Sequence, residues 1–132
     1  MLGQKFKELP DDNGYKPHYL FWLSQLFHEV GNYVREKELL VYVLELQRGL
    51  GNMIKIAETL RALARASMFL DLNTEGIQQA KESLGIYEEP NSIPGQAELL
   101  SNLAELLHQD NQLDAAEEAV SKSINLVLGK GE

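Results

Sequence analysis

The chain repeats itself at an interval of forty residues, and this repeat constrains its fold more than any other feature. Four series of similar residues share the spacing: Leu20, Leu60 and Leu100; Leu23, Leu63 and Leu103; Ser24, Ala64 and Ala104; and Phe6, Leu46, Ile86 and Leu126. Self-similarity at about this period is typical of stacked-repeat proteins, because a single helical unit cannot bury its apolar face without neighbours. The sequence therefore predicts an array of similar units.

Within each unit, the apolar spacing predicts two helices and no strand. The expected helices run from near Pro17 to the Gly31-Asn32 turn, from Tyr33 to about Leu46, from Met53 to Leu70, from Asn73 to Tyr87, from Gln96 to His108 and from Leu113 to Leu128. Gly49 and Gly51 are the expected end of the second helix, and residues 89–95 the clearest loop. Because Ala80 and Ala116 are 36 residues apart, we expect about four extra residues at the internal turn of the middle pair.

The predicted fold is a single all-α domain over residues 1–132, an α-solenoid of antiparallel helix pairs. Its repeats are expected at 17–50, 53–89 and 96–128, preceded by a partial repeat at 1–12 in which Phe6 is in phase with Leu46. An array without polar caps exposes apolar surface at its ends. We therefore expect a piece of a longer array, or association through the repeat ends.

Charge and composition exclude several classes of partner. The net charge is −8, and all of it comes from residues 73–132, which hold eleven acidic and three basic side chains. An acidic surface repels a phosphate backbone, so nucleic acid is not an expected partner. The longest apolar run, 39–44, is too short to cross a bilayer, and the chain has no Cys. These features predict a cytoplasmic protein that does not enter membranes.

The third unit carries a recognisable pattern. Leu100-x2-Leu103-Ala104-x2-Leu107, followed by Asn111-Gln112-Leu113-Asp114-Ala115-Ala116, resembles a tetratricopeptide repeat. The forty-residue period and the recurring Ala-Glu-x-Leu at 57–60 and 97–100 are similar to the kinesin-light-chain-like subgroup, as in the repeat arrays of signalling and sensor proteins. In the first unit, Glu36 stands where this pattern has Ala. The resemblance implies a right-handed superhelix that binds proteins in a concave groove lined by the first helix of each pair.

The resemblance also places the groove residues, one position beside each core stripe. They are His18, Phe21, Trp22, Gln25, Arg61, Arg65, Met68, Asn102, Glu105 and His108. Arg61 and Arg65 share a helix face and could hold a carboxylate or phosphate, or form an ordinary surface pair with nearby acids. Phe21 and Trp22 are an expected aromatic anchor, with packing beneath the N-terminal segment as the alternative.

Two functions remain open at this point. One is a scaffold that binds a peptide or helix of a partner protein in the groove. The other is a structural segment that assembles through its repeat ends, in a longer array or as a homo-oligomer. The chain has no Cys nucleophile, no glycine-rich phosphate loop and no zinc-binding His pair on one helix, so we expect no enzyme, cofactor or metal.

Overall fold

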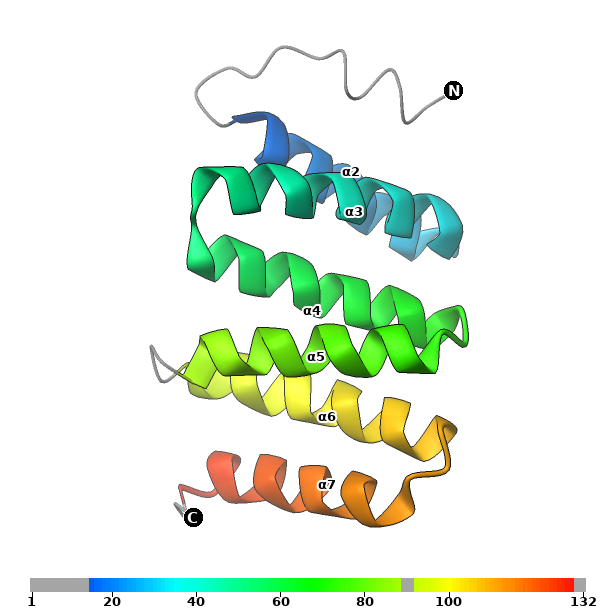
Figure 1. Ribbon diagram of the computed structural model, residues 1–132, viewed down its shortest axis with the longest axis vertical. Coiled ribbons are helices and arrows are strands. Elements are labelled where there is room, and N and C mark those ends of the chain that lie inside the picture. The colour runs from blue at the N-terminus through cyan, green and yellow to red at the C-terminus, as the bar shows by residue number, and fades with distance from the viewer. Residues whose placement is uncertain (1–14, 89–91, 130–132) are drawn as a thin grey trace.

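The computed structural model describes residues 15–88 and 92–129, and within these ranges helices joined by short turns are the only secondary structure, as the sequence predicts. The helices, labelled as in Figure 1, are α2 (Tyr15–Glu29), α3 (Tyr33–Leu50), α4 (Met53–Phe69), α5 (Asn73–Glu88), α6 (Ile93–Gln109) and α7 (Leu113–Val127). We call α2, α4 and α6 the first helices and α3, α5 and α7 the second helices of the three pairs. The partial repeat expected at 1–12 lies outside the described residues.

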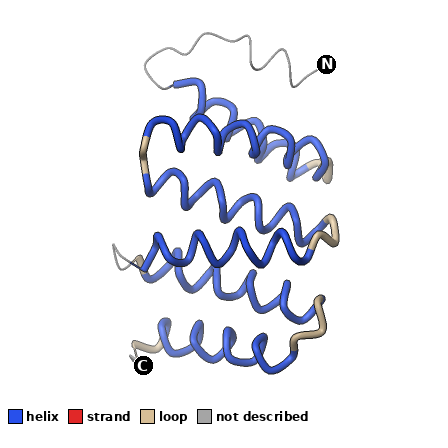
Figure 2. The backbone as a smooth tube through the Cα atoms, viewed as in Figure 1, coloured by secondary structure: helices blue, strands red, loops and turns tan. Residues whose placement is uncertain are grey.

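The six helices form a stack that follows the order of the chain (Figure 1). Each helix packs against the ones before and after it, and α4 also contacts α6. The connections alternate between the two sides of the view, so consecutive helices run antiparallel (Figure 2). This packing of sequential neighbours is the arrangement expected of helical repeats.

The turn inside each pair has the same conformation at forty-residue intervals. Gly31, Asp71 and Asn111 have φ of 80°, 60° and 62°, the left-handed region that Gly adopts freely and that Asp and Asn tolerate. In each turn, the next residue along the chain donates its amide to a carbonyl five residues earlier, at 2.8–2.9 Å. Each turn spans three residues, at 30–32, 70–72 and 110–112, so the four extra residues expected in the middle pair do not exist.

The error came from aligning Ala80 with Ala116. The turns show that the residue equivalent to Ala116 is Gly76, and that the equivalent residue in the first pair is Glu36, forty residues before Gly76. All three residues are buried. A Cβ atom on Gly76 would lie 2.6 Å from Cδ2 of Leu106 on α6, so a larger residue there would require the Leu106 side chain to move. Ala80 and Ala116 are the same residue type but are not equivalent in the repeat. The position of Glu36, Gly76 and Ala116 requires only a residue that its neighbours can accommodate.

Two other predicted boundaries are wrong. The loop expected through Gly95 ends earlier, because Ile93, Pro94 and Gly95 already form the first turn of α6. Proline is tolerated there, since amides in the first turn of a helix have no hydrogen-bond partner within the helix. Gly49 lies inside α3, and Gly51 alone ends it, with φ of 72° and an amide that donates to the Gln47 carbonyl.

Three of the four predicted series lie in the interior, and the described members of the fourth, Leu46, Ile86 and Leu126, are half-buried. Leu20, Leu60 and Leu100 are buried, as are Ser24, Ala64 and Ala104, and Leu63 and Leu103; Leu23 is half-buried. A recurring hydrogen bond joins the helices of the last two pairs: Ser83 Oγ donates to the Ala57 carbonyl at 2.7 Å, and Ser123 Oγ donates to the Ala97 carbonyl at 3.1 Å. The repeat therefore includes polar contacts as well as apolar packing.

Candidate functional site

All ten predicted groove residues lie on the first helices. His18, Trp22, Glu105 and His108 are exposed, and the other six are partly buried: Phe21, Gln25, Arg61, Arg65, Met68 and Asn102. Met68 packs against the core formed by the last two pairs, and the ring of Trp22 lies 6.2 Å from that of Tyr19. These residues divide among separate surroundings.

A hollow of about 560 Å³ lies between α6 and α7 and brings together the predicted residues Glu105 and His108. Ser101, Ala104, Leu113, Ala116, Glu117, Val120, Ser123 and Ile124 complete its lining. This hollow lies along the last pair of helices, apart from the predicted residues of the first pair.

A second hollow, of about 520 Å³, lies where α2, α3 and α4 meet. It contains the predicted residues His18 and Phe21, and its other lining residues are Gln47, Leu50, Asn52, Lys55, Glu58 and Thr59. Phe21 and Leu50 give this hollow apolar surface, and His18, Lys55 and Glu58 give it polar groups of both signs. The combination suits a ligand that has an apolar side chain beside polar atoms.

The start of α4 forms one wall of this second hollow, and hydrogen bonds hold it in place. The Asn52 side chain caps the helix by accepting a hydrogen bond from the Lys55 amide at 3.2 Å. The Thr59 hydroxyl donates to the Lys55 carbonyl at 2.8 Å, and the Lys55 ammonium lies 3.5 Å from a Glu58 carboxylate oxygen. Lys55, which the sequence analysis did not select, is thus held at the edge of the hollow.

Arg61 and Arg65 both have partners within the chain. Arg61 Nη1 lies 2.6 Å from Glu98 Oε1, which joins α4 to α6. Arg65 Nη2 donates to Gln25 Oε1 at 2.6 Å, which joins α4 to α2. The two guanidinium groups therefore bind neighbouring first helices on opposite sides of α4, and their joint binding of a ligand stays a prediction.

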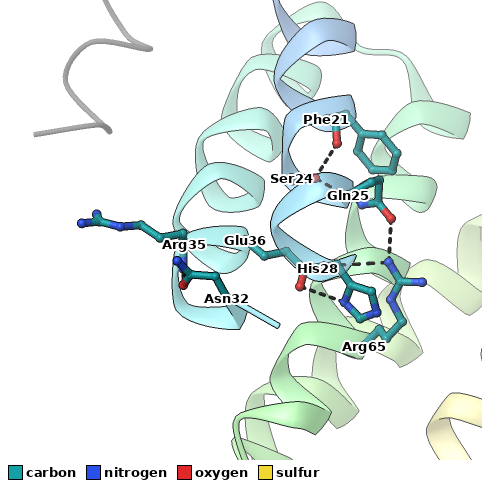
Figure 3. A network of polar contacts seen from close by, with 8 residues as sticks. All are labelled: Phe21, Ser24, Gln25, His28, Asn32, Arg35, Glu36 and Arg65. Atoms are coloured by element: carbon teal, nitrogen blue, oxygen red, sulfur yellow. Dashed lines mark hydrogen bonds and ion pairs between the residues drawn. The ribbon is translucent and has the colours of Figure 1, made fainter. Parts of the chain in front are cut away.

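Arg65 also belongs to a polar network around the buried carboxylate of Glu36 (Figure 3). Glu36 Oε1 lies 3.0 Å from His28 Nδ1, and Glu36 Oε2 lies 3.8 Å from Arg65 Nη2. The Glu36 side chain has no exposed surface, and its Oε2 atom has no hydrogen-bond partner. Glu36 on α3 thus links the end of α2 to the C-terminal half of α4 through the side chains of His28 and Arg65.

Three rings lie together beside this network. The rings of Tyr33 and Phe69 stack with centroids 4.6 Å apart, and the His28 ring lies 5.4 Å from each of them. Such a cluster adds apolar contact at the edge of α2, α3 and α4, and it includes the His28 ring that contacts Glu36. The sequence analysis missed Glu36 and Tyr33 as interacting residues, although the glutamate at an alanine position was the available signal.

The electrostatics of Glu36 follow from this burial. Burial raises the pKa of the Glu36 carboxyl above its ordinary value, and the hydrogen bond and charge of His28 and the charge of Arg65 offset the rise in part. Burial also raises the pKa of Tyr87, whose ring lies 5.9 Å from the Arg61 guanidinium. Both groups are held in place by packing, and neither opens into the hollows described above.

Within residues 15–88 and 92–129, no group of three or more His, Asp or Glu side chains is arranged to hold a metal ion. None of the helices described here combines the length and the apolar character that a membrane span requires. No model of a known protein family matches the chain, and no curated protein matches it either.

Proposed function

We propose that this protein is a right-handed solenoid of tetratricopeptide-like repeats, similar to the kinesin-light-chain-like subgroup, that acts as a protein-interaction scaffold. In this proposal, a peptide or helix of a partner protein binds across α2 and α4. The observation that carries the proposal is the hollow of about 520 Å³ that His18 and Phe21 border. Its size lies within the range of about 300–1,000 Å³ that is usual for ligand sites.

The surroundings of the hollow support a protein ligand. Phe21 and Leu50 can receive an apolar side chain, while Lys55 and Glu58 can bind polar groups beside it. The net charge of −8 disfavours nucleic acid. A non-catalytic role in the cytoplasm belongs to the same proposal.

The test begins with peptides selected on the wild-type protein from a random phage-displayed library. Their affinity is then measured by fluorescence polarisation for the variants Lys55→Glu and Lys81→Glu. Lys81 is an exposed residue of α5 outside the hollow, so its variant carries the same change in charge at a control position. Phe21 is unsuitable for this test because it packs against the cores of the first two pairs.

We expect Lys55→Glu to weaken binding about tenfold or more, which is the effect of losing about 1.4 kcal/mol, and Lys81→Glu to leave it unchanged. Equal binding by Lys55→Glu and the wild type, or a selection that yields no peptide, would contradict the proposal. Melting curves of both variants separate a loss of binding from a loss of folding.

A further inference from the structure

The outward face of α7 exposes apolar side chains at positions that the preceding second helix buries. Val120, Ile124 and Val127 are 45%, 51% and 68% exposed. Their equivalents forty residues earlier on α5 are Ala80, Leu84 and Tyr87, which are buried or half-buried between α5 and its neighbours. The exposed face of α7 therefore corresponds to the face by which the second helix of one pair packs against the first helix of the next pair.

The outward face of α2 shows the complementary pattern. Tyr19, Trp22 and Leu26 are 38%, 53% and 40% exposed. Their equivalents on α4 are Thr59, Ala62 and Ala66, and on α6 Leu99, Asn102 and Leu106; all six are buried or half-buried. The exposed face of α2 thus corresponds to the face by which the first helix of one pair packs against the second helix of the preceding pair.

The two exposed faces are the two halves of an interface that the chain forms twice internally, between α3 and α4 and between α5 and α6. We infer that two copies of this chain stack head to tail, with α2 of one protomer packed against α6 and α7 of its partner. The contact continues the internal interface in the same register, and it does not depend on the proposed peptide-binding hollow.

The sizes of the facing side chains fit this junction. In the interior, large residues on one helix meet small ones on the next: Leu106 of α6 lies against Gly76 of α5. At the exposed end, the hollow of about 560 Å³ between α6 and α7 has Ala104 and Ala116 in its lining. Trp22 and Leu26 of the second copy supply the bulk that would fill it.

Charge also fits the junction. Lys37 on α3 lies 3.0 Å from Glu75 on α5 and so links two successive second helices. By the forty-residue equivalence, the corresponding pair at the junction is Glu117 of one protomer and Arg35 of the other. The charges are again opposite, with the signs exchanged between the two helices. Since a head-to-tail contact leaves one face of each kind free, further copies can add to either end.

Sedimentation velocity over a wide range of protein concentration tests this inference with the full chain. We expect the mean mass of the wild type to rise with concentration, and Trp22→Glu and Ile124→Glu each to remain monomeric. An equimolar mixture of the two variants should form a dimer that grows no further, because each variant retains the face that the other lacks. This rescue by mixing distinguishes a head-to-tail contact from contact between two identical faces.

Val41→Glu is the matched control. Val41 is 42% exposed on α3, and its equivalents Lys81 and Ser121 are exposed polar residues, so this position faces solvent in every pair. The control should associate as the wild type does, and so should Lys55→Glu, which separates this inference from the proposed function. Circular dichroism checks folding, and Trp22→Gln and Ile124→Gln replace any glutamate variant that does not fold.

Three results would overturn the inference. A wild type that stays monomeric at every concentration excludes the second copy as the occupant of these faces, including the case in which residues 1–14 cover α2. Self-association of either single variant to the wild-type extent shows that its face is not used. A mixture that remains monomeric, although the wild type associates, excludes the head-to-tail arrangement.

Discussion

Glu36 shows how one residue can depart from a repeat pattern and still be accommodated. The equivalent residues are Gly76 and Ala116, which fill little space, whereas Glu36 extends a carboxylate into a fully buried place. Removing a polar partner of a buried carboxylate leaves its charge less well compensated, which is destabilising. The contacts of Glu36 with His28 on α2 and Arg65 on α4 are therefore what accommodate it at this position.

The raised pKa of Glu36 predicts a specific pH dependence. The folded state binds the proton of Glu36 more tightly than the unfolded state does. The contribution of this group to stability is therefore greatest below its ordinary pKa of 4.5. It is lost as the pH rises through the higher pKa of the folded state. Glu36→Gln removes this pH-dependent contribution to stability. We expect the melting temperature of the variant, relative to that of the wild type, to increase between about pH 4 and pH 7.

Thermal unfolding at a series of pH values measures this difference. Glu38→Gln is the control, because Glu38 is 52% exposed and its partner is Arg35, a surface residue of the same helix. Its profile should parallel that of the wild type. A difference for Glu36→Gln that stays constant or falls as the pH rises would show that the ion pairs with His28 and Arg65 outweigh the burial of the carboxylate.

The sequence could not predict this network, although it predicted all six helices. Helix positions follow from local apolar spacing and from turn residues, both of which can be read within a few residues. His28 and Arg65 reach Glu36 from two other helices, eight and 29 residues away in the chain, so the contact exists only once three helices have packed. The same holds for Arg61, whose partner Glu98 comes from the next repeat.

Among the elements, α4 and α6 carry the same motif in different surroundings. Ala64 and Ala104 are equivalent by sequence, and both are small residues on the buried side of a first helix. Helix α4 contacts the following first helix, α6, and Ala64 has no exposed surface. Ala104 borders the open hollow beside α7 and retains 7% exposure.

This contrast predicts unequal effects of the same substitution. Ala64→Leu should overpack the interior and lower the free energy of unfolding by about 1–3 kcal/mol, whereas Ala104→Leu should cost less because its added atoms can extend into the hollow. Chemical denaturation of the two variants measures both values. Equal losses would show that the hollow between α6 and α7 is too rigid to accept a larger side chain.

At the scale of the whole molecule, each helix is stabilised by its immediate neighbours along the stack. Such an array behaves nearly as a one-dimensional chain of coupled units, so a helix that packs on both sides is held more firmly than one that packs on one side. Helices α4, α5 and α6 each pack between two others, while α7 has a packed neighbour only at α6 among the described residues. Stability should therefore decrease toward α7, and its opening need not disturb α4.

Hydrogen exchange followed by mass spectrometry tests this gradient. In dilute solution, we expect amides of α4 and α5 to exchange about tenfold or more slowly than those of α7, because α7 can separate without unfolding the rest. Raising the protein concentration should slow exchange in α7 if a second copy packs against its exposed face, while exchange in α5 should change little. Equal protection of α5 and α7 in dilute solution would mean that the stack unfolds as one cooperative unit, since the loss of a terminal helix would then require the loss of all six.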